Sequence, residues 1–193
     1  MSRVKIQGPN GQIVLLDQIR QDAFDTVTLD ENSTINEERE FFSDIQGKAP
    51  YQTNLNQANL LEKNVSFLVM ALQIDAQVTN PANAAILATL QEFSDLKLRI
   101  GERDFWKGAM RLATGKLEQE SSTTVADTSF YLQQYGCATN NGVLFGKDSH
   151  EIPSLFTFKV VMNSRTPVGT SIAAGTQVNL VCRLKGLQRR PVQ

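Results

Sequence analysis

The sequence predicts a mainly antiparallel all-β protein, a sandwich or barrel of roughly six to eight strands with long loops. Three observations lead to this fold class. Apolar and polar residues alternate in several stretches after residue 64, as in strands buried on one face. Turn residues separate these stretches, and one segment between two of them has the composition of a short helix. The sequence contains no internal repeat and no low-complexity tract that would indicate another architecture.

Length and charge fit one sizeable domain. A chain of 193 residues can bury roughly 70% of its unfolded surface, so its core needs no metal or disulfide. Lys and Arg number 19 and Asp and Glu number 20, a formal charge of −1. This balance argues against nucleic-acid binding over the whole surface, although a local basic patch remains compatible with it.

The cysteines and the N-terminus indicate where the protein is made. Cys137 and Cys182 allow one disulfide, but Cys182 falls on the apolar side of a predicted strand, so we expect a small buried hydrophobe there. The N-terminus lacks the apolar core of a signal peptide, and no run approaches the roughly 18 apolar residues of a membrane span. We therefore expect a protein made in the cytoplasm and soluble when made.

The first 60 residues differ from the rest, and we expect an N-terminal arm (1–60) followed by a β domain (61–193). Apolar residues in the arm come in short bursts among Gln, Asn and Asp, and "GPNG" at residues 8–11 is a turn signal. These short bursts offer little apolar surface for a core of their own.

A short helix is expected within this arm, in "STINEEREFFSDIQG". Thr34 can cap its first turn, Glu37 has the spacing of a capping box, Glu38 suits the positive helix end, and Gly47 can end the helix. Its apolar set is thin, so the helix is expected to dock on its own barrel or on a neighbour. The set comprises Ile35, Phe41, Phe42 and Ile45. The alternative is a mobile acidic linker.

Three elements are expected between residues 65 and 108. "VSFLVMALQIDAQV" predicts a long strand with two apolar faces at its start. Asn80 and Pro81 then signal a helix in "NPANAAILATLQEF". "LKLRIGERDFWKG" alternates again as far as Gly101. The inward faces of the two strands are expected to carry Leu68, Met70, Leu72, Ile74, Ala76 and Val78, opposite Phe67 and Val69, and then Leu96, Leu98 and Ile100.

The remainder alternates loops and strands. Residues 116–129 read as a polar loop, "FYLQQYG" as a strand, and Asn141 with Gly142 as a hairpin turn. "SLFTFKVVMN" and "TQVNLVCRLKG" are strands, the second closed by Gly186. Their apolar faces are expected to carry Phe156, Phe158, Val160 and Met162, and Val178, Leu180, Cys182 and Leu184.

No motif predicts catalysis. His150 is the single histidine, and neither cysteine stands at a metal-ligand spacing from it. The sequence has neither the G-x-S-x-G pattern of a nucleophile elbow nor a glycine loop for phosphate after a strand. We expect a protein that is not an enzyme and uses no cofactor, metal or small-molecule substrate. An enzyme with a buried carboxylate pair is the less favoured alternative.

Two clusters are candidate contact sites. Arg103, Phe105, Trp106 and Lys107 in "RDFWKG" combine aromatic and basic residues, as a stacking site for a ligand or nucleic acid does. We favour a barrel corner, where the two aromatic residues cover the end of the core.

The second cluster is the densest group of basic residues, at the C-terminal end of the sequence. It comprises Arg183, Lys185, Arg189 and Arg190. These side chains can meet phosphate, but because the chain is not basic we favour pairing with an acidic patch of a neighbouring copy. That acidic patch comprises Glu37, Glu38 and Glu40.

From about residue 40 onward the chain resembles the jelly-roll capsid proteins of tailless icosahedral bacteriophages. The resemblance lies in four stretches in order: "FFSDIQGKAPYQTNLNQANLLEKNVSFLVMALQI", "LKLRIGERDFWKGAMRLATG", "IPSLFTFKVVMN" and "VNLVCRLKGLQRRPVQ". They correspond to an arm entering the first barrel strand, an inner hairpin, a late strand and the closing strand.

The resemblance implies a single eight-stranded jelly roll with an N-terminal arm, working as a major capsid or vertex protein of the virion. Its partners would be copies of itself, other capsid proteins and, through the arm or the C-terminal residues, packaged nucleic acid or an internal membrane. Glu37, Glu38, Phe41 and Phe42 would be assembly contacts, together with the C-terminal basic cluster. The alternative function is a lectin-like or receptor-binding module with its ligand at residues 102–110 and 138–150.

Overall fold

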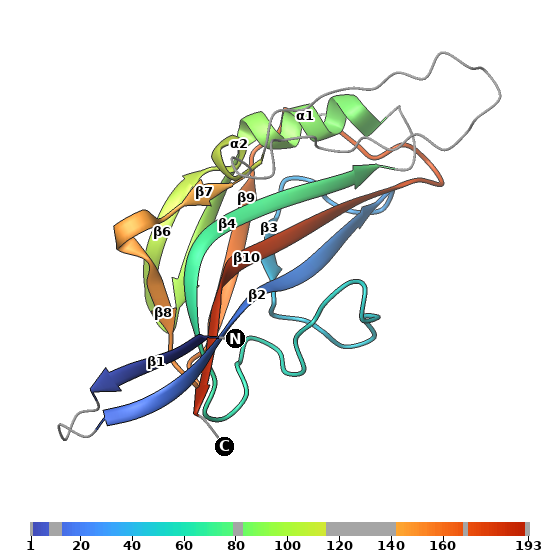
Figure 1. Cartoon of the computed structure of the whole chain (residues 1–193). Helices are drawn as coiled ribbons and strands as arrows, with labels where there is room; N and C mark the ends of the chain where they lie inside the picture. The colour runs from blue at the N-terminus through green and yellow to red at the C-terminus, as the bar shows by residue number, and fades with distance from the viewer. Residues whose placement is uncertain (1, 8–12, 79–82, 115–141, 168–169, 192–193) are drawn as a thin grey trace, which may run out of the picture.

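The structure, a computed structural model, describes residues 2–7, 13–78, 83–114, 142–167 and 170–191. Within these ranges the chain folds mainly as antiparallel strands, in two curled sheets that face each other across one core (Figure 1). Helices α1 (Ala84–Phe93) and α2 (Met110–Ala113) cover one end of the two sheets. The predicted mainly antiparallel all-β class is thereby confirmed.

The larger sheet has the strand order β1-β2-β10-β4-β7, and β8 also pairs with β4. The smaller sheet has the order β3-β9-β5-β6. The strands of the larger sheet are β1 (Ser2–Gln7), β2 (Ile13–Asp30), β4 (Ser66–Val78), β7 (Val143–Leu144), β8 (His150–Ile152) and β10 (Gln177–Pro191). Those of the smaller sheet are β3 (Glu38–Phe41), β5 (Ser94–Ile100), β6 (Arg103–Ala109) and β9 (Phe158–Ser164).

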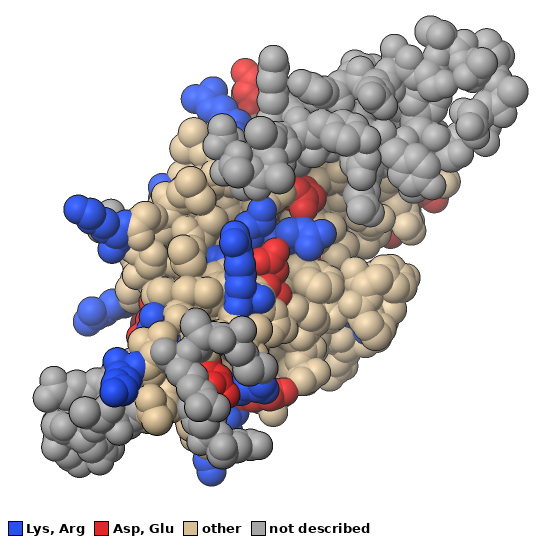
Figure 2. Space-filling model, in the orientation of Figure 1, with Lys and Arg blue, Asp and Glu red and all other residues tan. Residues whose placement is uncertain are grey.

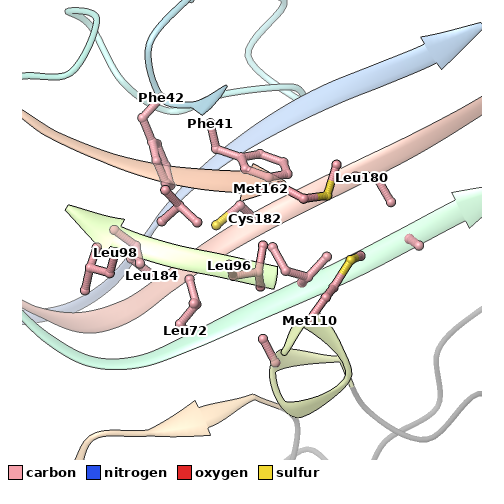
Figure 3. Packing of buried hydrophobic residues seen from close by; sticks show 14 of the residues in the cluster. Phe41, Phe42, Leu72, Leu96, Leu98, Met110, Met162, Leu180, Cys182 and Leu184 are labelled. Atoms are coloured by element: carbon pink, nitrogen blue, oxygen red, sulfur yellow. The ribbon is translucent and has the colours of Figure 1, made fainter. Parts of the chain in front are cut away.

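The core lies between the two sheets, and strict alternation along three strands supplies most of it. Figure 3 shows side chains from both sheets pointing toward one another. The predicted inward faces of β5 and β10 are confirmed, and so is that of β9 from Phe158 onward, whereas Phe156 lies exposed before the strand. The buried residues of these three faces are Leu96, Leu98, Ile100, Phe158, Val160, Met162, Val178, Leu180, Cys182 and Leu184.

A β-bulge in β4 changes which residues face the core. Lys185 of β10 pairs with Ala71, whereas the next residue, Gly186, pairs with Val69, so Met70 is the extra residue. Val69 is buried before the bulge, and Leu72 is buried after it. The prediction that Leu68 and Met70 share the buried face of Leu72 is therefore wrong, and Met70 is 44% exposed.

The sequence predicted that Gly186 ends the last strand, and this prediction is wrong. Strand β10 continues to Pro191 and pairs with β2 along its whole length. A Cβ atom on Gly186 would lie 2.0 Å from the carbonyl oxygen of Leu68. Glycine is therefore present because β10 and β4 approach each other closely at the bulge, and not because the chain turns.

The first 60 residues are integrated into the body, which corrects the expectation of a separate arm with a helix. Strand β2 is an inner strand of the larger sheet, between β1 and β10. The segment expected to be helical instead forms β3, which ends at Phe41, and the next residue, Phe42, lies in the left-handed region with φ of 72°. Phe41 and Phe42 are fully buried. Pairing with β9 places Phe41 in the core, and the Phe42 ring packs on Phe158 of β9 at 5.4 Å between centroids. This burial outweighs a capping signal.

The remaining predictions divide between confirmed elements and undescribed residues. Helix α1 is confirmed, and β5 and β6 form the expected hairpin around Gly101. The predicted polar loop at 116–129, the predicted strand "FYLQQYG" and Asn141 of the expected turn lie outside the described residues.

Candidate functional site

His150 lies in an aromatic cluster and not among metal ligands or nucleophiles. Its ring centroid is 5.1 Å from that of Phe105 and 5.4 Å from that of Phe145. Among the described residues no group of three or more His, Cys, Asp and Glu side chains is placed to hold a metal ion. In the same part of the chain, no helix has the length and apolar content that crossing a membrane requires.

The "RDFWKG" segment forms the edge strand β6, and its two aromatic residues differ in role. Trp106 is half-buried against the core and meets the Phe145 ring edge-on at 6.2 Å between centroids. Phe105 is more exposed and covers His150. Arg103 and Lys107 are exposed. Trp106 thus covers the core, as we expected. The segment itself is a strand, whereas a barrel corner was expected.

One ion pair links β5 and β6 in the smaller sheet. The Arg99 Nε donates a hydrogen bond to Asp104 Oδ1 at 2.7 Å. This hydrogen bond holds the pKa of Asp104 below its usual value, and the positive charges of Lys97 and Lys107 act in the same direction. Arg99 and Lys97 of β5 and Lys107 of β6 therefore act on one carboxylate, which weakens the case for an anion site on this strand.

The predicted acidic patch and basic cluster each have partners in the same chain. Glu37 lies 3.4 Å from Arg39, and Glu40 pairs with Lys159. Arg183 lies 2.7 Å from Asp75, and Arg189 lies 3.5 Å from Glu151.

The two groups also belong to different sheets, because β3 lies in the smaller sheet and β10 in the larger. In the view of Figure 2, Lys and Arg side chains lie beside Asp and Glu side chains in the middle of the face. Among the remaining candidates, Glu38 and Arg190 are exposed and Lys185 is half-buried. Phe41 and Phe42 are core residues, so the prediction that they are assembly contacts is wrong.

A buried ion pair fixes the loop between β3 and β4. The Lys48 Nζ lies 2.8 Å and 2.9 Å from the two carboxylate oxygens of Asp25, which is 0% exposed on β2. Asp25 Oδ2 also accepts a hydrogen bond from the backbone N–H of Phe42 at 2.7 Å. The carboxylate is thus satisfied on both oxygens, and it holds the loop and the end of β3 against β2.

A few residues later the same loop is bonded to β2 beyond the end of its pairing with β1. Asn54 Oδ1 accepts from the Phe24 N–H at 2.9 Å, and Asn54 Nδ2 donates to the Asp22 carbonyl at 2.7 Å. Thr53 Oγ1 donates to the Phe24 carbonyl at 3.2 Å. The loop therefore substitutes for a neighbouring strand and is fixed in position relative to the sheet.

Tyr51 stands on this anchored loop at the side of a groove. The groove has a volume of about 370 Å³ and runs over β2 and β10, on the sheet face that points away from the core. Its floor is a ladder of cross-strand pairs in which Phe24 faces Arg183 and Thr28 faces Asn179. The Tyr51 side chain is 80% exposed although the backbone around it is firmly held.

The β1–β2 hairpin extends beyond the body of the two sheets (Figure 1). Within the described residues β1 pairs with β2 alone. Val4 and Leu16 are opposite each other on one face, and Leu15 and Ile19 occupy the other face of β2. Leu15 is 43% exposed, and the other three are half-buried. The hairpin therefore presents apolar side chains on both faces.

Cys182 is a free thiol at the centre of the core. Burial raises its pKa well above the ordinary value of 9.0, and the negative charges of Asp25 and Asp75 raise it further. Both effects keep the thiol protonated, and the thiolate is the reactive form. The expectation of a small buried hydrophobe at Cys182 is confirmed.

We expect Cys182 to resist alkylation until the protein unfolds. At pH 8.5 its labelling by iodoacetamide should be at least about 100-fold slower in buffer than in denaturing urea. Mass spectrometry of the peptide that contains Cys182 measures this. The free energy of unfolding should also fall as the pH rises above 9.0, because only the unfolded thiol loses its proton there. Equal labelling rates in the two conditions would contradict the burial.

No protein-family model, curated protein or solved structure matches the chain. Its function is therefore argued from its own residues. Asp25, Lys48 and Tyr51 are not among the site residues that the sequence predicts. One signal was present, because Asp25 falls on the buried side of β2 with Ala23 and Leu29, and a carboxylate in that position requires a partner.

Proposed function

We propose that the chain is a structural subunit of a virus shell, a capsid protein with a jelly-roll body that assembles with copies of itself. The observation that carries this proposal is the β1–β2 hairpin, which extends from the body with apolar residues on both faces. Strand β10 ends opposite Leu16, so the outer part of the hairpin has only two strands. A two-stranded ribbon is marginally stable in water, and apolar residues on both of its faces favour a protein neighbour. The hairpin lies within residues 1–60, the segment in which the resemblance places an arm that contacts partners.

The packed core and the apolar residues exposed outside it support the same proposal. A shell subunit needs a rigid core and contact surfaces but no catalytic centre. Two closely packed sheets supply the core, and large apolar side chains at Leu112 and Leu144 remain exposed outside it. Contacts with other capsid proteins, with packaged nucleic acid or with an internal membrane are further parts of this proposal, as is a location in the virion.

Assembly can be tested with one charged substitution on the hairpin. We expect the purified protein to form closed shells or regular rings, measured by light scattering and negative-stain imaging. Leu15→Asp should keep it small, because a carboxylate buried at a contact lacks a partner. The change should move the free energy of unfolding by no more than about 0.5 kcal/mol, because Leu15 is exposed.

Leu155→Asp is the matched control, since Leu155 is exposed in the loop before β9, and it should assemble as the unchanged protein does. A stable monomer at every salt concentration would contradict the proposal and favour the ligand-binding module. Assembly of Leu15→Asp into the same particles would show that the hairpin is not the contact.

A further inference from the structure

We propose that the groove beside Tyr51 binds the ring of a neutral saccharide. This site is separate from the hairpin and goes beyond a role in assembly. The sequence placed a ligand at residues 102–110 and 138–150, but there Trp106 and Phe145 pack on each other. The groove beside Tyr51 instead combines an exposed aromatic ring, side-chain amides with donor capacity left over, and a rigid frame.

The loop that carries Tyr51 is a rigid frame. The Asp25–Lys48 ion pair and the bonds from Asn54 hold the backbone on both sides of Tyr51. A tyrosine whose purpose is packing would turn its ring into the protein, but this ring is 80% exposed. A preorganised loop that presents an aromatic ring to solvent beside a groove is suited to stacking on a ligand, because little ordering entropy remains to be lost on binding.

The polar groups of the groove suit a ligand that carries several hydroxyls. Thr28 Oγ1 donates to Asn179 Oδ1 at 2.7 Å, and this bond directs the amide nitrogen of Asn179 outward as a donor. Gln52 Oε1 accepts from the Ala49 N–H at 2.9 Å, which likewise leaves the Gln52 amide nitrogen as a donor. Neighbouring hydroxyls of a sugar donate and accept, so they can pair with the Thr28 oxygen and with both amide nitrogens.

The charge of the groove argues for a neutral ligand. Arg183 is the single charged residue among the described groove-lining side chains. Its Nε donates to Asp75 Oδ2 at 2.7 Å, and its guanidinium carbon lies 5.6 Å from the centre of the Phe24 ring. The positive charge is therefore already balanced, and a polyanion such as nucleic acid finds no excess of cations here. A saccharide offers an apolar C–H face for Tyr51 and hydroxyls for the amides without any charge.

Saturation-transfer difference NMR on the full chain tests the proposal, and it works for a monomer and for a large assembly. The probes are D-glucose, D-galactose, D-mannose and N-acetyl-D-glucosamine, each titrated separately. At least one should receive saturation on its ring protons. Tyr51→Ala should raise its Kd roughly tenfold, and Tyr51→Phe should restore the affinity to within about twofold because the ring remains.

Phe156→Ala is the matched control, because Phe156 is another exposed aromatic residue, 54% exposed, outside the groove. Its Kd should equal that of the unchanged protein. The proposal is overturned if none of the four sugars receives saturation, or if Tyr51→Ala binds the sugar as tightly as before. It is also overturned if an oligothymidylate binds the groove in a Tyr51-dependent way and the sugars do not. Each result is independent of whether the protein assembles.

Discussion

Replacement of Lys48 by Met is expected to lower the free energy of unfolding by about 3–5 kcal/mol. The Asp25 carboxylate is 0% exposed, and Lys48 Nζ contacts both of its oxygens. Without the ammonium group, one hydrogen bond from the Phe42 N–H remains for a buried negative charge. The loss in free energy of unfolding comes from leaving an uncompensated charge in the core. It is much larger than the stabilisation that an exposed ion pair contributes.

Urea unfolding followed by circular dichroism measures this effect, and two further variants define its cause. Glu37→Gln breaks the exposed pair with Arg39, 3.4 Å long, and should cost less than about 1 kcal/mol. Asp25→Asn combined with Lys48→Met removes both charges and should recover a large part of the lost stability. If Lys48→Met costs no more than Glu37→Gln, the pair does not hold the loop.

The elements that the sequence predicted well are those in which local alternation and tertiary burial agree. In β10 the residues Val178, Leu180 and Cys182 are all buried, and each is separated from the next by one outward residue. Such a pattern fits one structure alone, because a shift of one residue would expose every apolar side chain. Helix α1 was predictable for a related reason, since its sequence favours a helix between two clear strands.

The errors arise where a distant partner decides the local structure. Glu37 has the spacing of a capping box after Thr34. Burial of Phe41 and Phe42 in the core stabilises the chain more than a helix cap would, so the segment forms β3. The bulge at Met70 is likewise set by the partner strand, because the register shift appears only in the pairing with β10. Neither feature leaves a local signal in its own segment.

The candidate site was even less accessible from sequence. The groove joins Tyr51 of a loop to Thr28 of β2 and Asn179 of β10. These three residues are far apart in the chain and belong to no motif. Aromatic and basic residues that are close in sequence, as in "RDFWKG", suggested a site more directly, although the structure pairs Asp104 of this segment with Arg99 and packs Trp106 against the core.

Replacement of Gly186 by Ala is expected to lower the free energy of unfolding by at least about 3 kcal/mol. The added Cβ would lie 2.0 Å from the Leu68 oxygen and 2.9 Å from the Phe67 ring. A backbone oxygen cannot move aside as a flexible side chain does, so β10 and β4 must separate at the bulge. Gly47→Ala is the control, because a Cβ there meets no atom within 4 Å and costs only left-handed strain, about 1–2 kcal/mol.

The positions at which amide hydrogen exchange becomes faster should distinguish this local clash from general unfolding. Gly186 divides β10 into a half that lines the core, up to Leu184, and a half that pairs with β2 near the hairpin, from Leu187 onward. Hydrogen exchange should therefore quicken most from Leu187 to the strand end and in the facing part of β2, while Val178 to Leu184 stay protected. Because the same half of β2 supports β1, Gly186→Ala should also impair assembly. Uniform exchange along β10, or a stability equal to that of Gly47→Ala, would show that the two strands do not require glycine at their closest approach.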